Sequence, residues 1–348
     1  MKIDGIEISR NHPPYIIAEI SANHNGAIAK ALKLIELAKE CGADAVKIQT
    51  YTADTMTVDS QRSDFKIEGG PWDGYTLYQL YREAHTPWEW HKNLFEKAGE
   101  VGITFFSSPF DETAVDFLAD LNVPAFKVAS FELKDLILIE YMAKQMKPMI
   151  VSSGMANTNE IEEALAIIRK YHNNIILLHC VSGYPTPLEQ SNLSTVSDLE
   201  GRFKVIPGLS DHTLGTAAAV ASVALGACVI EKHFIESRKD KGPDSDFSLE
   251  PSELRTLCFE TKSIWKSLQG EKYEMKEAES PNLKFRRSIY FIKSLKAGDV
   301  IAEDSIKRIR PGFGLEPKYF NEIIGKKVKR NIEENSPVKW DDINWDNQ

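Results

Sequence analysis

The sequence of 348 residues is poor in cysteine and has no long hydrophobic run. Its four cysteines, Cys41, Cys180, Cys228 and Cys258, form no CxxC pair, which argues against a zinc knuckle or a redox-active dithiol. The longest apolar tract, residues 217–230, is rich in alanine and too short to cross a bilayer. Charge and proline, rather than an apolar signal segment, follow the first residue, so we expect a cytoplasmic protein that makes no use of a membrane.

The chain also lacks a basic run. It contains 42 Lys and Arg against 51 Asp and Glu, which gives a net charge of −9. Proteins that grip a nucleic-acid backbone do so with clustered basic residues, so this composition predicts no nucleic-acid partner. A small anion could still bind where a few lysines converge. The hydrophobic fraction of 42% is sufficient for a globular protein with a substantial core.

Short apolar segments alternate with amphipathic segments through most of the chain. Buried apolar strands separated by helices indicate a parallel sheet covered on both faces, and eight such units favour a closed (β/α)8 TIM barrel, an α/β fold. No GxGxxG follows the first predicted strand, which disfavours a dinucleotide-binding sheet. The predicted strands are residues 16–21, 45–49, 104–107, 125–129, 149–152, 175–180, 205–209 and 228–232. Helical spacing predicts helices over residues 29–41, 88–101, 112–121, 160–171 and 213–225.

Polar side chains end almost every predicted strand. The carboxyl ends of barrel strands converge on one mouth, where enzymes of this fold carry out their chemistry. A strand end is often polar only because it meets solvent, but eight in succession favour a shared site. The residues at these ends include Glu19, Lys47, Gln49, Ser108, Lys127, Ser130, Glu132, Ser152, Ser182, Tyr184, Ser210, His212, Glu231 and His233.

Two lysines within this set indicate an anion site. Lys47 and Lys127 lie in predicted strands, where lysine is rarely buried without an anionic partner. Two ammonium groups together with several serine hydroxyls suit a phosphate or phosphoenol group. The alternatives are salt bridges to Glu19 or Glu132, or a single reactive lysine of a Schiff-base aldolase.

His212 and His233 end successive strands, in the segments SDH and EKH. Neutral imidazoles on neighbouring strand ends can share one divalent ion. Two histidines without cysteine leave coordination positions open to water or substrate, which is typical of a catalytic metal site. Either histidine alone is more often structural, but their equivalent positions favour a metal site.

The pattern changes after residue 265. We predict a barrel domain over residues 1–267, a charged linker without periodicity over 268–284, and a small β-rich domain over 285–348. Residues 50–87 form a second irregular segment, which is long for a connection between a strand and a helix. We expect this insertion to be a lid or specificity element. The alternative is a surface hairpin that packs Leu77 and Leu80 against the barrel.

A series of motifs runs through the chain in the order IIAEISANHNG, VKIQTYT, FFSSPFD, FKVAS, SSGM, LHCVSGYPTP, GLSDHT, EKHF and KGPD. Together these motifs resemble those of the sialic acid synthase family, and RIRPGFG resembles the antifreeze-like (SAF) domain of these enzymes. The resemblance implies a metal-dependent transferase that condenses phosphoenolpyruvate with an open-chain amino sugar and releases phosphate by C–O cleavage. It also implies a domain-swapped homodimer in which the SAF domain of one chain closes the barrel mouth of the other.

Residues 69–91 resemble the pseudaminic acid synthase branch of that family, through WDG, LYQLY and TPWEW. The branch implies 2,4-diacetamido-2,4,6-trideoxy-altrose as the sugar and pseudaminic acid as the product. Synthesis of N-acetylneuraminate or legionaminate is the alternative within the family. A Schiff-base aldolase using Lys127 and a non-enzymatic ice- or glycan-binding protein are alternatives outside it. Ser182 stands where the N-acetylneuraminate branch tends to carry Asn, so the contact of that Asn is not carried over.

The resemblance implies a role for individual residues. Glu19 would be the acid or base near the forming bond, and His212 and His233 would bind a divalent ion, Mn²⁺ first and Mg²⁺ or Co²⁺ otherwise. Phosphoenolpyruvate would be held by Lys47, Ser108, Phe110, Lys127, Ser130, Ser152 and Ser210. The sugar would be contacted by Gln49, Glu132, Tyr184, Asp244 and the partner subunit's Arg310.

Overall fold

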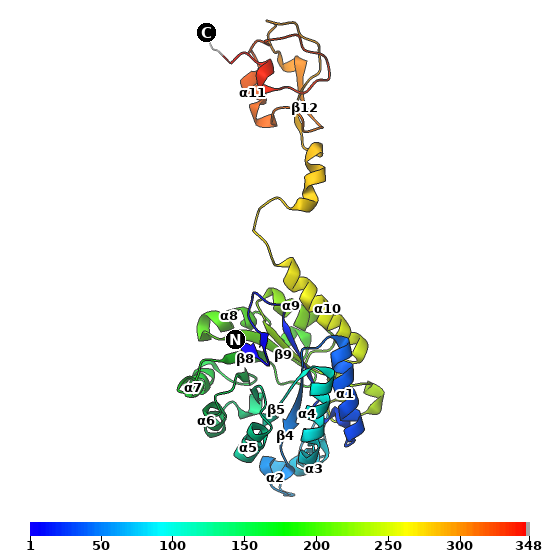
Figure 1. The fold of residues 1–348 in the computed structure, drawn as a ribbon, viewed down its shortest axis with the longest axis vertical. Helices are drawn as coiled ribbons and strands as arrows, with labels where there is room; N and C mark the ends of the chain where they lie inside the picture. Colours follow the sequence, from blue (N-terminus) through cyan, green and yellow to red (C-terminus); the bar gives the residue numbers. More distant parts are fainter. Residues whose placement is uncertain (346–348) are drawn as a thin grey trace. The chain divides into compact units, whose positions relative to one another are not determined.

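The computed structural model describes residues 1–345, and the chain divides into two compact units, Met1–Gln269 and Gly270–Gln348. In the first unit, eight parallel strands close into a barrel in which each strand lies beside the next in the chain (Figure 1). The last strand pairs with the first, so the predicted TIM barrel is confirmed. The strands are β3 (Tyr15–Glu19), β4 (Ala45–Thr50), β5 (Thr104–Pro109), β6 (Phe126–Val128), β7 (Met149–Ser152), β8 (Ile175–Cys180), β9 (Ile206–Asp211) and β10 (Val229–His233).

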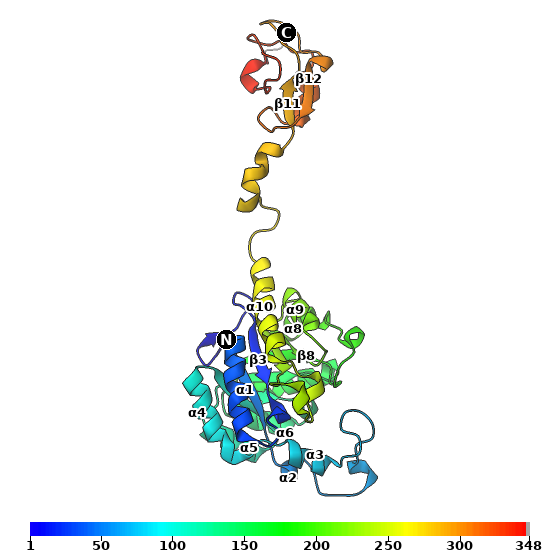
Figure 2. The same cartoon turned by 90° about the vertical axis from the view of Figure 1, so that its right-hand side faces the viewer.

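Helices surround the barrel on its outer face (Figures 1 and 2). The predicted helix over residues 213–225 begins later, at Ala217, because the turn before it is bound to the side chains of Asp211 and Lys232. The helices between or after the strands are α1 (Ile28–Cys41), α4 (His91–Val101), α5 (Glu112–Asp120), α6 (Leu136–Lys144), α7 (Thr158–Arg169), α8 (Thr195–Phe203), α9 (Ala217–Ala224) and α10 (Pro251–Ser267).

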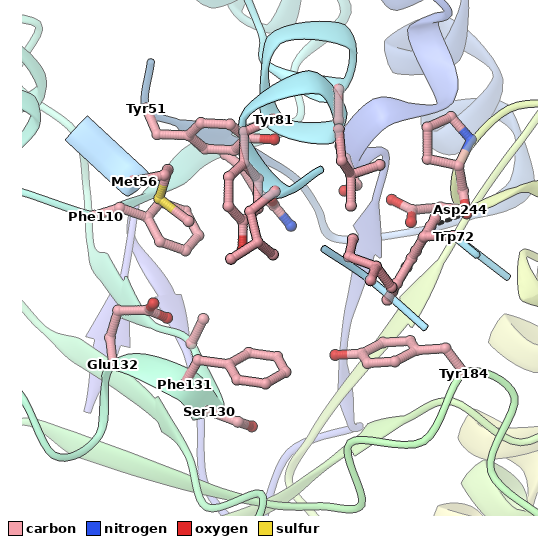
Figure 3. Close-up of a pocket in the computed structure, with 18 of the residues that line it drawn as sticks. Tyr51, Met56, Trp72, Tyr81, Phe110, Ser130, Phe131, Glu132, Tyr184 and Asp244 are labelled. Atoms are coloured by element: carbon pink, nitrogen blue, oxygen red, sulfur yellow. Dashed lines mark hydrogen bonds between the residues drawn. The ribbon is translucent and has the colours of Figure 1, made fainter. Parts of the chain in front are cut away.

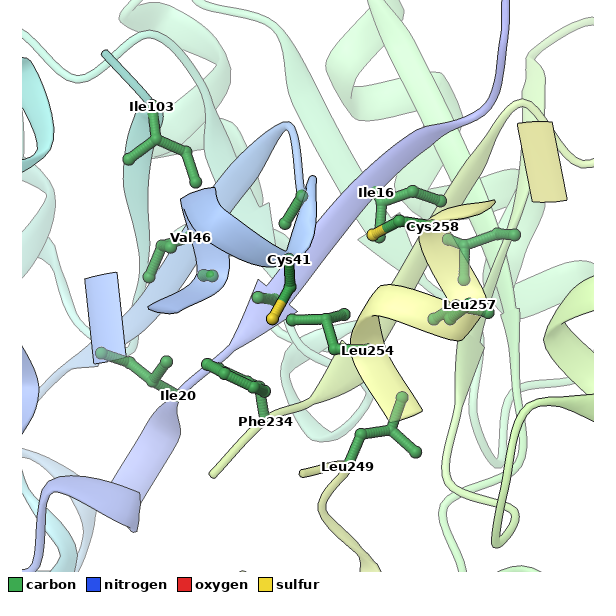
Figure 4. Close-up of a cluster of buried hydrophobic side chains, with 14 of the residues drawn as sticks. Ile16, Ile20, Cys41, Val46, Ile103, Phe234, Leu249, Leu254, Leu257 and Cys258 are labelled. Carbon is green, nitrogen blue, oxygen red and sulfur yellow. The ribbon is translucent and has the colours of Figure 1, made fainter. Parts of the chain in front are cut away.

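Successive side chains along each strand point to opposite sides of the sheet, so the apolar side chains form two layers. In β3, Ile16 and Ala18 pack outward against the helices, whereas Ile17 packs inside the barrel. Figure 4 shows the outer layer, where strand residues meet Leu254 and Leu257 of α10. A hairpin of β1 (Lys2–Ile3) and β2 (Ile6–Glu7), which the sequence did not predict, adds to the inner layer, together with Ile8. Apolar side chains therefore fill the amino end of the barrel, and the polar strand ends occupy the other.

The insertion between β4 and α4 carries two short helices, α2 (Ala53–Met56) and α3 (Leu77–Ala84). The loop between them extends away from the barrel (Figure 2). A capping box in which Thr76 and Gln79 bond each other's backbone N–H starts α3, and one bridge, between Lys66 and Thr76, closes the loop. Leu77 and Leu80, which the alternative placed in a surface hairpin, lie in helix α3, and the hairpin-like loop is confined to residues 66–76.

The second unit has its own core around Ile289, Phe291, Ile301 and Val338. Its regular elements are β11 (Ser288–Phe291), β12 (Ile306–Ile309), which pair antiparallel, and α11 (Phe320–Ile323). Isolated bridges join its other segments, and a 3-10 helix at Glu277–Phe285 buries no side chain. The last three residues of the predicted domain, 346–348, lie outside the described residues. No helix within residues 1–345 combines the length and the apolar composition that a membrane span requires.

His91 provides a test of the barrel's response to acid. This side chain is fully buried at the start of α4, where Nε2 lies 2.7 Å from Thr50 Oγ1 and Nδ1 lies 3.2 Å from the Pro87 carbonyl oxygen. Burial lowers the pKa of His91 from 6.5 to about 4, although the Pro87 carbonyl opposes this. Between these two pH values the unfolded chain binds a proton that the folded protein does not, so stability falls as the pH falls below 6.5.

We therefore expect His91→Gln to weaken the pH dependence of stability. One pKa unit corresponds to about 1.4 kcal/mol, so the imidazole should account for about 2 kcal/mol of the stability lost between pH 7 and pH 5. Urea unfolding of both proteins, followed by circular dichroism at the two pH values, measures this difference. An unchanged loss in the variant would contradict the assignment.

Candidate active site

Four buried charged side chains alternate in sign at the carboxyl end of the barrel interior. Lys47 forms a salt bridge with Glu19, as one sequence alternative predicted, and its Nζ lies 3.7 Å from Glu231 Oε1. Lys127 Nζ also lies 3.7 Å from that oxygen, so Glu231 stands between the two lysines. Burial raises the pKa of Glu19 to about 7, against the opposing effect of Lys47. Glu19 can therefore take up or release a proton near neutral pH.

Serine hydroxyls from neighbouring strands complete this group. Lys47 Nζ donates to Ser108 Oγ at 3.3 Å, and Lys127 Nζ donates to Ser152 Oγ at 2.7 Å. Ser210 Oγ donates to Glu231 Oε1 at 3.3 Å. The backbone N–H of Gly154 donates to Ser130 Oγ at 3.2 Å. Two ammonium groups and several hydroxyls thus converge, as an anion of the phosphate class requires.

Gly154 packs so closely against two serines that any larger residue there would force them to shift. A Cβ built on it would overlap both Ser182 Oγ and Ser130 Oγ. Ser182 therefore lies beside Ser130 above the backbone of Gly154. The requirement for glycine comes from this close approach and not from the backbone angle, which is not in the left-handed region.

The predicted metal ligands lie next to each other. The rings of His212 and His233 are 5.4 Å apart between centroids. His212 Nδ1 lies 3.0 Å from the Val181 carbonyl oxygen, which leaves Nε2 for another partner. His233 Nδ1 is buried without a hydrogen-bond partner, 3.9 Å from Asp244 Oδ2, and burial holds the pKa of His233 well below its ordinary value.

This pair suits a divalent ion, since the low pKa of His233 keeps its imidazole neutral, the form that coordinates, and its buried Nδ1 lacks a partner. Residues 1–345 contain no cluster of three or more side chains of the metal-binding types. The donor set therefore fits an ion held by two histidines, with its remaining positions open to water or substrate.

A cavity of about 370 Å³ opens beside this group and is built from two parts of the chain (Figure 3). The barrel contributes polar groups, and the insertion contributes a mostly apolar wall. Burial raises the pKa of Glu132 to about 7, and its Oε2 is buried without a partner. From the barrel the lining includes Gln49, Phe110, Ser130, Glu132, Tyr184, His233 and Asp244, and from the insertion Met56, Ile67, Trp72, Leu77, Leu80 and Tyr81.

Trp72 joins the insertion to the barrel side of the cavity. Its indole N–H donates to the Pro243 carbonyl oxygen at 2.9 Å, and its ring centroid lies 5.5 Å from that of Tyr184. The Tyr184 ring in turn lies 4.5 Å from His212. The insertion is thereby connected, through two aromatic rings, to the histidine pair.

The structure brings most of the candidate residues to this one mouth. Arg310 belongs to the second unit, where it is exposed and precedes the cis peptide bond to Pro311. Glu231 received no role from the sequence, although it lies between the two lysines. Alternation could have found it, because Glu231 stands two residues before His233 on the same face of β10.

Comparison with known proteins identifies the family. Residues 34–273 match the NeuB family model, and residues 286–344 match the SAF domain model. The chain belongs to the NeuB family. Its relatives in this family include a pseudaminic acid synthase of Campylobacter jejuni, 43% identical over 94% of this chain and 96% of that protein. The family resemblance seen in the motifs is thus confirmed.

Other NeuB-family relatives are similar over comparable lengths. A pseudaminic acid synthase of Helicobacter pylori is 41% identical over 95% of this chain and 98% of that protein. An N,N'-diacetyllegionaminic acid synthase of Campylobacter jejuni is 37% identical over 93% and 98%. Among solved structures, an N-acetylneuraminic acid synthetase of Leptospira borgpetersenii is 32% identical and covers 82% of this chain and 95% of its own, with a TM-score of 0.74.

Proposed function

We propose that this NeuB-family chain condenses phosphoenolpyruvate with 2,4-diacetamido-2,4,6-trideoxy-altrose to give pseudaminic acid and phosphate. The observation that carries the proposal is the identity of 41–43% to pseudaminic acid synthases along nearly the whole chain, against 37% for the legionaminic acid synthase. The apolar wall of the cavity supports it, because a 6-deoxy sugar presents a methyl group where N-acetylmannosamine presents a hydroxymethyl group.

In the reaction, C3 of phosphoenolpyruvate attacks the C1 aldehyde of the sugar, whose oxygen becomes a hydroxyl. Water adds at C2, and the C2–O bond to phosphate breaks. We assign Lys47, Lys127 and the hydroxyls of Ser108, Ser130, Ser152 and Ser210 to the charge on phosphoenolpyruvate and on the leaving phosphate, with Phe110 beside them. Glu19, with a pKa of about 7, would transfer a proton at the forming bond.

The sugar would lie in the cavity, against Gln49, Glu132, Tyr184 and Asp244. His212 and His233 would hold a divalent ion, with Mn²⁺ the first candidate and Mg²⁺ or Co²⁺ as alternatives. When bound there, such an ion supplies Lewis acidity toward the aldehyde. Asp244 and Tyr184 lie beside the histidines and would orient the sugar carbonyl toward them.

Product analysis tests this proposal. Each candidate sugar is supplied alone with phosphoenolpyruvate, and the product is identified by mass spectrometry together with phosphate release. We expect a nine-carbon acid of the pseudaminic acid mass from the altrose derivative. Efficient synthesis of N-acetylneuraminate or legionaminate instead would reassign the sugar while keeping the reaction.

A Schiff-base aldolase through Lys127 is the second candidate, because burial lowers the pKa of this lysine. The hydrogen bond to Ser152 and the proximity of Glu231 favour the ammonium form, which cannot attack a carbonyl. Borohydride treatment in the presence of substrate would trap an adduct of the aldolase, whereas the proposed synthase should give none.

We further propose that the working enzyme is a domain-swapped homodimer in the cytoplasm, with the partner subunit's Arg310 completing the sugar site. Mixing inactive Arg310→Ala with inactive Glu19→Ala should then restore part of the activity once subunits exchange. One of the two mixed sites would carry neither substitution. Measured heterodimers that show no recovered activity would contradict closure by the partner.

A further inference from the structure

Along β9 and β10, outward-facing residues alternate with the inward-facing ones, and two of the outward-facing side chains form a pair next to the two histidines. Asp211 and Lys232 are direct register partners, adjacent to His212 and His233 respectively. Lys232 Nζ lies 2.7 Å from Asp211 Oδ2, and the two side chains are 1% and 3% exposed. The preceding outward residues of these strands, Leu209 and Ile230, belong to the apolar layer beneath the helices. A buried ion pair thus interrupts an apolar face next to the histidines.

Stability alone does not explain the pair. Removing two charges from water costs free energy that their attraction often fails to recover, and apolar residues of similar size frequently stabilise a protein as much or more. Asp211 and Lys232 therefore call for a role in holding a particular geometry.

The hydrogen bonds of the pair enclose the backbone around His212. Asp211 Oδ1 accepts from the Thr213 N–H at 2.9 Å, and Lys232 Nζ donates to the Thr213 carbonyl oxygen at 2.6 Å. Both backbone groups of the residue after His212 are thereby tied to side chains beside the two histidines. The carbonyl oxygen of His212 also accepts from the Thr186 N–H at 3.0 Å. Rotation of this strand end relative to β10 would break several buried hydrogen bonds at once.

We propose that Asp211 and Lys232 are positioning residues that fix His212 and His233 at the spacing needed to share one divalent ion. This inference rests on the metal site of the proposed function. The pair acts from the opposite face of the sheet, so it contacts neither substrate nor ion. Residues that orient metal ligands in this way change metal affinity by about 10–100-fold when they are replaced.

Mn²⁺ affinity, measured by electron paramagnetic resonance without substrates, tests the pair separately from turnover. The variants are Asp211→Asn, Lys232→Met and the double variant. Each single variant should weaken Mn²⁺ binding by about 10–100-fold. The double variant leaves no unpaired buried charge, so it should be thermally more stable than either single variant, yet bind Mn²⁺ as weakly.

Asp342→Asn provides the matched control. Asp342 is a 2% exposed carboxylate that pairs with Arg330 in the second unit, so its loss should lower stability and leave Mn²⁺ affinity unchanged. If the unmodified enzyme binds no Mn²⁺, the metal site and this inference both fail. If it binds Mn²⁺ and the double variant, folded, binds it equally well, only the positioning role is overturned.

Discussion

Replacement of His212 or His233 with alanine is expected to lower kcat/KM by about 1000-fold or more. A Lewis acid contributes several kcal/mol of transition-state stabilisation, and each 1.4 kcal/mol corresponds to a factor of ten. The substitutions remove one of the two imidazoles whose rings lie 5.4 Å apart, and residues 1–345 contain no cluster of three or more metal-binding side chains that would hold the ion without it. Initial rates with saturating Mn²⁺, together with metal content after dialysis, measure the effect.

His179→Ala is the matched control for this prediction. His179 also lies near the end of a strand and is 7% exposed, but its Nε2 lies 2.8 Å from the Ser191 carbonyl oxygen. Its replacement should affect stability and spare metal binding. A His212→Ala/His233→Ala protein that retains full activity in excess chelator would show that no ion at these residues takes part in catalysis.

The second large effect concerns the sugar. We expect kcat/KM with N-acetylmannosamine to be at least about 100-fold below that with the diacetamido trideoxy sugar. An apolar wall discriminates only weakly against an added hydroxyl, by about 1–3 kcal/mol. The larger share must come from buried polar groups left unpaired when the 4-acetamido group is missing. Competition assays with both sugars at saturating phosphoenolpyruvate give this ratio directly, and equal turnover of the two sugars would refute the assignment.

The insertion is the segment on which this selectivity should depend. Replacing residues 67–75 with a short Gly-Ser connection removes Ile67 and Trp72 from the cavity and keeps the capping box of α3 at Thr76. The ratio of kcat/KM for the diacetamido trideoxy sugar to kcat/KM for N-acetylmannosamine should fall, and KM for phosphoenolpyruvate should change little. Tyr75→Ala is the control, because Tyr75 bonds Glu83 and lies outside the cavity. If the replacement weakened phosphoenolpyruvate binding as much as it lowered the selectivity between the sugars, the insertion would not be a sugar-specific element.

The barrel was predictable because its strands are short, apolar and evenly separated by helical patterns. The N-terminal hairpin was missed, since two-residue strands such as Lys2–Ile3 carry no periodicity to detect. In the second unit, single bridges such as Leu295–Ile332 replace regular ladders, and turns rather than alternation define the chain path. Helix α3 has a signal that was available, the Thr76–Gln79 capping box.

For the site, sequence reasoning placed residues at the mouth but could not pair them. Lys127 lies close to Glu231 and not to Glu132, the candidate that is nearer in the sequence. This pairing depends on the closure of the barrel, which the sequence alone does not show. The close approach of Ser182 and Ser130 to Gly154 likewise brings together residues from three separate strand ends. The order of the motifs identified the chemistry of the family, while the distances needed the fold.

The apolar side chains that fill the amino end of the barrel also affect the order in which the substrates bind. Ile3, Ile8 and Phe106 fill that end, so substrates and products must enter and leave through the carboxyl end. Lys47 lies two residues before Gln49 on β4, and Gln49, not Lys47, lines the cavity. A ligand on the lysines is therefore seated below a ligand in the cavity. Phosphoenolpyruvate should enter first and the sugar second, and phosphate should depart only after the nine-carbon acid, an order that product-inhibition patterns would record.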